Sequence, residues 1–199
     1  MSASFRLAGD WLSTCDKHHD RCPKLLSSEL PTRVIDVSPT DGSTHPKLYI
    51  TQGERSTYAT LSYCWGQKQE LVLSSDNLES FQKRLPYEKL PKTLRHAIVC
   101  IKRLRIRYLW IDSLCIIQDS AEDKEAEIAS MVDVFGRAYV TLQAAISSHC
   151  QEGFLLSRQI SSHISLPFLC PDSRVGTIQL RKIRGAEITD RKGARAEPL

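Results

Sequence analysis

RYLWIDSLCIIQ, residues 107–118, is the stretch of the sequence that decides the fold. Residues 108–111 are apolar or aromatic in succession rather than in alternation, which is typical of a strand whose two faces are both covered by helices. Asp112 follows them directly. We therefore expect a buried parallel strand with a polar group at its carboxyl end, where open α/β sheets place their ligand crevice.

Helix and strand patterns alternate on both sides of this strand. Residues 91–104 begin with a proline and repeat apolar side chains at helical spacing. Ser120 and Asp123 resemble a capping box at the start of another helix. Apolar strands at residues 58–65 and 138–145 complete a β-α-β-α-β order, which predicts a mostly parallel α/β sheet flanked by helices. The side chains expected to face the sheet are Leu94, Ala97, Ile98, Ile101 and Leu104 in the first helix and Ile128, Met131, Val132 and Phe135 in the second.

The N-terminal part of the chain has different patterns. Residues 5–26 are predicted to form an amphipathic helix. Residues 32–37 and 47–51 are short β-type runs separated by turn-forming residues, so they are predicted to form a hairpin. We therefore assign residues 1–50 to an N-terminal helical leader with a hairpin and residues 51–199 to the main domain.

The bulk composition is that of an ordinary globular protein, with 41% of the 199 residues hydrophobic and 25% charged. No apolar run is long enough to span a bilayer, and the N-terminus lacks the continuous apolar stretch of a secretory signal. Seven cysteines are an odd number, and several lie in apolar runs, so a disulfide framework is not expected. We expect a cytoplasmic protein with no membrane span.

The formal net charge of +4 is concentrated near the C-terminus, because residues 173–199 hold seven Lys or Arg and three Asp or Glu. A basic chain end is more often solvated than a reader of nucleic acid. The charge distribution therefore predicts no specific nucleic-acid binding.

Four separated blocks of this sequence resemble the pattern of fungal heterokaryon-incompatibility (HET) domains. They are LSYCWG (61–66), LPKT (90–93) with Ala97 and Ile98, YLWIDSLCIIQ (108–118), and the helix through Glu127 and Met131 into AYVT (138–141). Flanking segments before and after these blocks also resemble the pattern, so the match covers roughly residues 11–158 with order and spacing preserved. The resemblance implies a TIR-like or flavodoxin-like three-layer fold. It also implies a role in programmed cell death and self/non-self recognition, through protein partners or self-assembly.

Two departures from the HET pattern bear on function. The pattern usually has a Trp three residues before the helix glutamate, and here that residue is Lys124. The family also ends its domain with an Arg-x-Trp and Gln-Glu motif, whereas this sequence stops at Leu199. The resemblance therefore implies that the HET domain, residues 51–199, is incomplete at its C-terminal end, and an inactive truncated fragment is one alternative.

The candidate binding residues are Trp65, Gly66, Asp112, Cys115 and Gln118. Asp112 and Cys115 lie at the carboxyl end of a predicted strand, and Trp65 and Gly66 end a neighbouring one, so they are expected to border one crevice. Gln118 belongs to the same motif as Asp112. Structural roles are the alternatives, because an aspartate after a strand often caps a turn and a tryptophan there is often part of the core.

Glu127 is the candidate catalytic residue, and only the resemblance selects it. HET domains are distantly similar to TIR domains, some of which cleave NAD with a helix glutamate. Such a reaction needs a carboxylate that stabilises an oxocarbenium-like transition state. The alternative for Glu127 is an ordinary solvated carboxylate at the edge of the packed helix face. A TIR-like NAD-consuming enzyme is therefore the second functional hypothesis, with NAD as substrate and no bound cofactor.

Other site types are not expected. Cys64 and Cys115 are predicted to be buried, and no histidine has a recognisable nucleophile partner. One helical face carries four metal-binding residue types, but four ligands on a straight helix cannot surround an ion tetrahedrally, so no metal site is predicted. These four residues are Cys15, His18, His19 and Cys22.

Overall fold

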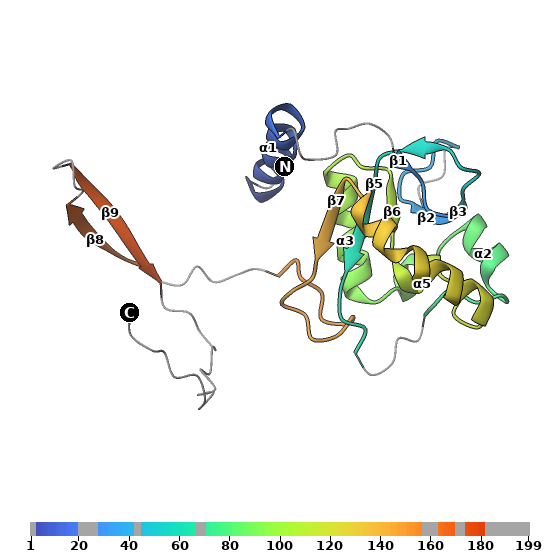
Figure 1. Ribbon diagram of the computed structural model, residues 1–199. Coiled ribbons are helices and arrows are strands. Elements are labelled where there is room, and N and C mark those ends of the chain that lie inside the picture. Colours follow the sequence, from blue (N-terminus) through green and yellow to red (C-terminus); the bar gives the residue numbers. More distant parts are fainter. Residues whose placement is uncertain are drawn as a thin grey trace, which may run out of the picture. The chain divides into compact units, whose positions relative to one another are not determined.

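The computed structural model describes residues 3–19, 28–41, 45–66, 71–156, 163–169 and 174–181. The chain divides into two compact units, Met1–Leu155 and Leu156–Leu199. The first unit holds the main sheet and its helices (Figure 1).

A five-stranded sheet in the order β3-β2-β6-β5-β7 forms the centre of the first unit. β6 pairs in parallel with β5, and β5 pairs in parallel with β7. β2 is antiparallel to both β3 and β6. The sheet is therefore mixed, and the predicted parallel arrangement applies to β5, β6 and β7. The strand bounds are β2 Arg33–Asp36, β3 Lys47–Ile50, β5 Tyr58–Ser62, β6 Tyr108–Trp110 and β7 Val140–Gln143.

The predicted hairpin forms, because β2 and β3 pair along their whole length from Arg33 opposite Ile50 to Asp36 opposite Lys47. It does not stand apart from the main sheet. Ile35 of β2 lies opposite Leu109 of β6, so the hairpin supplies two of the five strands. The sequence pattern of residues 32–51 predicts that the two strands of the hairpin pair with each other. It gives no information on which other strand of the sheet the hairpin pairs with.

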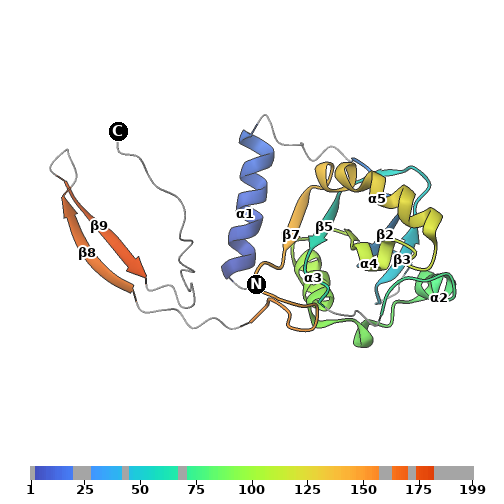
Figure 2. The ribbon, with the colours of Figure 1, turned by 60° about the horizontal axis from the view of Figure 1, so that its bottom comes forward.

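Helices lie on both sides of this sheet, with α5 over one face and α3 and α2 under the other (Figure 2). α3 connects β5 to β6, and α5 connects β6 to β7, as the helical patterns predict. α4 is a single turn directly after β6. The bounds are α2 Leu78–Lys83, α3 Lys92–Arg103, α4 Asp112–Cys115 and α5 Ala121–Gly136, with a short 3-10 turn at Tyr87–Lys89.

The main hydrophobic core lies where α3 packs on the strands. Leu94, Ala97, Ile98 and Ile101 are at most 1% exposed, which confirms the face predicted for this helix. Burying each of the larger side chains contributes about 1.5–3 kcal/mol. On the opposite face of the sheet, Trp110 meets Phe135 of α5 edge to face at 5.6 Å between ring centroids.

The buried face predicted for α5 is partly wrong. Ile128 and Val132 are 57% and 83% exposed, whereas Glu127 and Val134 are buried. Two polar contacts set the rotation of this helix. The carbonyl of Val134 accepts a hydrogen bond from the Tyr58 hydroxyl at 2.7 Å, and Glu127 pairs with Arg33 of β2. These contacts turn Ile128 and Val132 towards solvent.

The N-terminal helix α1 spans Ala3–His18. The helix was predicted to continue to residue 26, but residues 20–27 lie outside the described residues. The Asp16 carboxylate accepts a hydrogen bond from the Tyr139 hydroxyl at 2.6 Å, and the Arg103 guanidinium lies 4.8 Å from the centre of the Phe5 ring. α1 therefore contacts the rest of the first unit through a few side chains, and none of its residues is fully buried.

Two small antiparallel pairs complete the described structure. β1 (Ser28–Glu29) pairs with β4 (Arg55–Ser56) in the first unit. In the second unit, β8 (His163–Leu169) pairs with β9 (Val175–Arg181), a hairpin that the sequence patterns did not indicate. Across the part of the chain that the structure describes, no helix has the length and apolar character needed to cross a membrane.

Candidate functional site

The carboxyl ends of β5 and β7 meet at a change of chain direction in the sheet. From β5 the chain crosses to β6 on one side, and from β6 it returns across β5 to β7 on the other. In open α/β sheets a ligand crevice lies at such a switch point. A pocket of about 400 Å³ opens here. No Lys, Arg, His, Asp or Glu lines it, and its lining residues are Ser62, Tyr63, Cys64, Gln143, Ala144, Ala145 and Ser147.

Trp65 and Asp112 contact each other, as expected from their positions after two neighbouring strands, but neither of them lines this pocket. The Trp65 indole donates a hydrogen bond to Asp112 Oδ2 at 2.9 Å, and the Ser113 amide donates to Asp112 Oδ1 at 2.7 Å. Burial raises the pKa of Asp112, and the hydrogen bonds from Trp65, Ser113 and Tyr63 partly oppose this rise. Asp112 thus accepts a backbone hydrogen bond at the start of its own turn and anchors the Trp65 ring.

Tyr63 belongs to the same cluster, although the sequence interpretation did not select it. Its hydroxyl shares a 2.7 Å hydrogen bond with Ser113 Oγ. Its ring is close to parallel with that of Trp65, with the centroids 6.5 Å apart. Two aromatic side chains that follow β5 are therefore held by two consecutive residues of α4. The alternation Tyr63, Cys64, Trp65 along an extended chain was the available signal, because residues two apart project to one side.

Gly66 ends the Trp65 segment in a conformation that favours glycine. Its φ is +84°, and a Cβ atom at this position would lie 2.6 Å from the Cβ of His149. The adjacent carbonyl of Trp65 accepts a hydrogen bond from the Cys150 amide at 3.4 Å. Gly66 therefore allows the segment after β5 to approach the segment after β7, and its observed role is in packing.

Cys115 and Gln118 support the turn after β6. Cys115 is fully buried, as predicted, and burial raises the pKa of its thiol to about 12, so it is a poor nucleophile. The Gln118 side-chain amide donates to the carbonyls of Asp112 at 3.3 Å and Ile116 at 3.0 Å. The prediction that Cys64 is buried is wrong, because Cys64 is exposed at the pocket between β5 and β7.

Glu127 is only 6% exposed, so the interpretation as a solvated carboxylate is wrong. Its Oε1 lies 3.3 Å from Nη2 of Arg33, a buried residue that the sequence interpretation did not select. The same Nη2 lies 2.6 and 2.7 Å from the two carboxylate oxygens of Asp123, and Arg33 Nε donates to the Cys115 carbonyl at 2.6 Å. An arginine in the first position of a buried strand was the available signal, because such a charge needs a partner.

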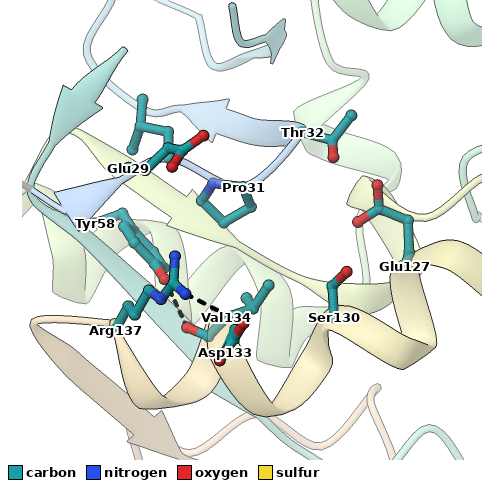
Figure 3. A pocket seen from close by; sticks show the side chains of 10 residues that line it. Glu29, Pro31, Thr32, Tyr58, Glu127, Ser130, Asp133, Val134 and Arg137 are labelled. Atoms are coloured by element: carbon teal, nitrogen blue, oxygen red, sulfur yellow. Dashed lines mark hydrogen bonds and ion pairs between the residues drawn. The ribbon is translucent and has the colours of Figure 1, made fainter. Parts of the chain in front are cut away.

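Glu127 also lines a second pocket, of about 190 Å³, between α5 and residues 29–32. Figure 3 shows Glu127 at one end and Tyr58 with Arg137 at the other. Three carboxylates line it, those of Glu29, Glu127 and Asp133, against one guanidinium from Arg137. Acidic linings disfavour a phosphate-bearing ligand by Coulomb repulsion.

The structure therefore brings Trp65, Gly66 and Asp112 to the carboxyl edge of the sheet and holds Glu127 separately against Arg33. The described residues contain no group of three or more His, Cys, Asp or Glu side chains placed to hold a metal ion. Cys22, one of the four residues considered on the N-terminal helix, lies outside the described ranges.

Comparisons with known proteins place the chain in a family. The family model described as "Heterokaryon incompatibility protein (HET)" matches residues 58–185, which is well over half of the chain. The match contains β5, Trp65, Asp112 and Glu127, the features on which the candidate site is built. No curated protein matches the chain, and no solved structure does so. The chain belongs to the heterokaryon incompatibility (HET) protein family.

Proposed function

We propose that this chain is a cytoplasmic signalling domain that acts in heterokaryon incompatibility, where it triggers programmed cell death in fungal cells through protein assembly. Membership of the HET family is the observation that carries this proposal. The assembly step has separate support from the exposed surface of α5.

That surface consists of Ile128 and Val132, one helical turn apart and 57% and 83% exposed. Residues at i and i+4 lie on the same side of a helix, so the two side chains form one apolar patch. The patch is small, and a partner that buried both side chains would gain about 1.5–3 kcal/mol for each. Such a gain fits regulated, reversible association better than a permanent interface.

The test compares matched substitutions of exposed apolar residues in the same unit. Ile128→Asp with Val132→Asp removes the α5 patch, whereas Ile146→Asp changes a residue that is 56% exposed elsewhere. Expression of each variant in a filamentous fungus should show loss of cell death only for the α5 double variant. Light scattering of the purified proteins should show reduced self-association for the same variant. Equal killing by all three proteins would contradict assembly through α5.

A second candidate function is TIR-like consumption of NAD, which is favoured by one observation: Glu127 borders a pocket. In such a reaction the carboxylate would stabilise positive charge on the ribose as the bond to nicotinamide breaks. The ion pair with Arg33 and the acidic pocket lining favour the signalling role instead.

Incubation of the purified chain with NAD separates the two functions. The signalling proposal expects no nicotinamide release. Enzymatic consumption would require release that Glu127→Gln abolishes and Asp133→Asn retains, because Asp133 lines the same pocket but pairs with Arg137 at the helix surface. That pattern of results would replace the signalling proposal with the enzymatic one.

A further inference from the structure

Two cysteines lie on neighbouring segments at the carboxyl edge of the sheet. Cys64 follows β5, and Cys150 lies in the loop that follows β7. The segments run side by side, since the Ala144 amide donates to the Ser62 carbonyl at 2.9 Å and the Cys150 amide to the Trp65 carbonyl at 3.4 Å. Both cysteines are therefore next to the close contact that Gly66 makes possible.

The two thiols have different environments. Cys64 is exposed and lines the pocket between β5 and β7, so a small oxidant can reach it from solvent. Cys150 is 1% exposed and is held in place by its carbonyl, which accepts a hydrogen bond from the Thr93 amide at 2.9 Å. Burial raises the pKa of Cys150, and the nearby Cys64 raises it further. Redox-sensitive cysteines are typically solvent-accessible and often have a second cysteine nearby that can resolve the oxidised form.

We propose that Cys64 and Cys150 form a reversible disulfide, with Cys64 as the residue that a hydroperoxide oxidises first. The Cys64 thiolate attacks the terminal oxygen of the hydroperoxide, and the O–O bond breaks. The Cys64 sulfur is oxidised to a sulfenic acid (S–OH), and the other oxygen takes up the proton that the thiol lost and leaves as an alcohol or as water. Cys150 loses its proton and attacks the Cys64 sulfur, forming the S–S bond and releasing water. A dithiol reductant returns both residues to thiols by exchange.

The bond would close the carboxyl ends of β5 and β7 on each other at the mouth of the pocket. A disulfide requires Cα atoms about 4.4–6.8 Å apart, so the position of the loop that carries Cys150 relative to Cys64 determines how readily it forms. Two helical crossovers lie between the cysteines in sequence, and a crosslink that closes such a long loop restricts the unfolded chain strongly. Oxidation should therefore raise the melting temperature while it narrows the pocket.

The test treats the whole purified chain with hydrogen peroxide, blocks the remaining thiols under denaturing conditions and maps the peptides by mass spectrometry. The expected product is a Cys64–Cys150 crosslinked peptide, with two hydrogens lost and both masses restored by dithiothreitol. Cys64→Ser should abolish the crosslink, and because this side chain is exposed the variant should fold. Cys15→Ser, a change on α1, is the matched control and should retain it.

Three outcomes would overturn the proposal. One is conversion of Cys64 to sulfinic or sulfonic acid while Cys150 remains fully alkylated. Another is a crosslink from Cys64 to any other of the seven cysteines. The third is a Cys64–Cys150 crosslink that appears only in denatured protein, which would show that the folded segments cannot reach each other.

Discussion

Arg33 links three elements of the first unit. One side chain joins β2, the end of α4 and two carboxylates of α5. Its removal would leave Glu127 buried without a cation. Such a loss costs about 3–5 kcal/mol, because the desolvation of the remaining charge is no longer offset.

Arg33→Ala is therefore expected to lower the free energy of unfolding by about 3–5 kcal/mol, as measured by urea denaturation. Arg137→Ala is the matched control. That arginine is 54% exposed and pairs with Asp133 at 3.2 Å, so its loss should cost about 0.5 kcal/mol or less. Similar losses in the two variants would show that the buried pair is not an important contribution to stability.

Gly66 gives a second prediction about a single residue. Gly66→Ala would place a Cβ 2.6 Å from His149 in a conformation with φ of +84°. The left-handed backbone alone costs about 1 kcal/mol, and the clash adds to it.

We expect Gly66→Ala to lower the melting temperature by several degrees. Gly136→Ala, at the end of α5 with no heavy atom within 4 Å of the new Cβ, should leave it unchanged or raise it slightly. An unchanged melting temperature for Gly66→Ala would mean that His149 moves away without cost.

At the scale of elements, α3 holds the chain after β7 through His96. The imidazole Nδ1 accepts hydrogen bonds from the amides of Phe154 and Leu155, both at 3.0 Å, so this nitrogen carries no proton. Burial lowers the pKa of His96, and the positive charges of Lys92 and Arg95 lower it further. Protonation of Nδ1 would break both hydrogen bonds.

The lowered pKa of His96 determines how the free energy of unfolding changes with pH. Above the ordinary histidine pKa of about 6.5, His96 is neutral in both folded and unfolded chains, and its contribution to stability is complete. As the pH falls below that value, the unfolded chain takes up a proton that the folded chain resists. The free energy of unfolding should therefore decrease towards the lower pKa of the folded state.

His96→Asn is expected to reduce the loss of stability between about pH 7.5 and 5.5, because its side-chain oxygen can accept a hydrogen bond without titrating. Urea denaturation at several pH values measures the free energy of unfolding of both proteins. An identical pH profile for the two proteins would assign the dependence to other groups.

At the scale of the whole molecule, the main core is complete within the first unit. All the buried core side chains of the described residues lie between Leu30 and Cys150. A two-stranded hairpin such as β8–β9 is at best marginally stable alone. The first unit should therefore fold without the second.

We expect a chain that ends at Leu155 to keep its cooperative thermal transition, with a melting temperature within a few degrees of the full chain. Circular dichroism and dispersed amide NMR signals check this prediction. Loss of the transition would show that residues 156–199 contribute to the folding of the sheet.

The sequence by itself determined the family, the helices α3 and α5, the three parallel strands and the neighbouring positions of Trp65 and Asp112. These features depend on local periodicity and on the rule that strands joined by helical crossovers end at the same edge of a sheet. The face of α3 also follows from periodicity, because its apolar stripe is the side that packs.

Only the tertiary structure decided the face of α5, the place of the hairpin and the partner of Glu127. Ile128 and Val132 fit an apolar stripe as well as Met131 and Val134 do. The choice between the stripes goes with two long-range polar contacts, the pairing of Glu127 with Arg33, about ninety residues earlier, and the hydrogen bond from Tyr58 to the Val134 carbonyl. Long-range electrostatic pairing leaves no periodic signal in a sequence, and for that reason the burial of Glu127 could not be predicted from the residues around it. The exposure of Cys64 depends on how the segments after β5 and β7 lie beside the pocket, which the residues around Cys64 do not encode either.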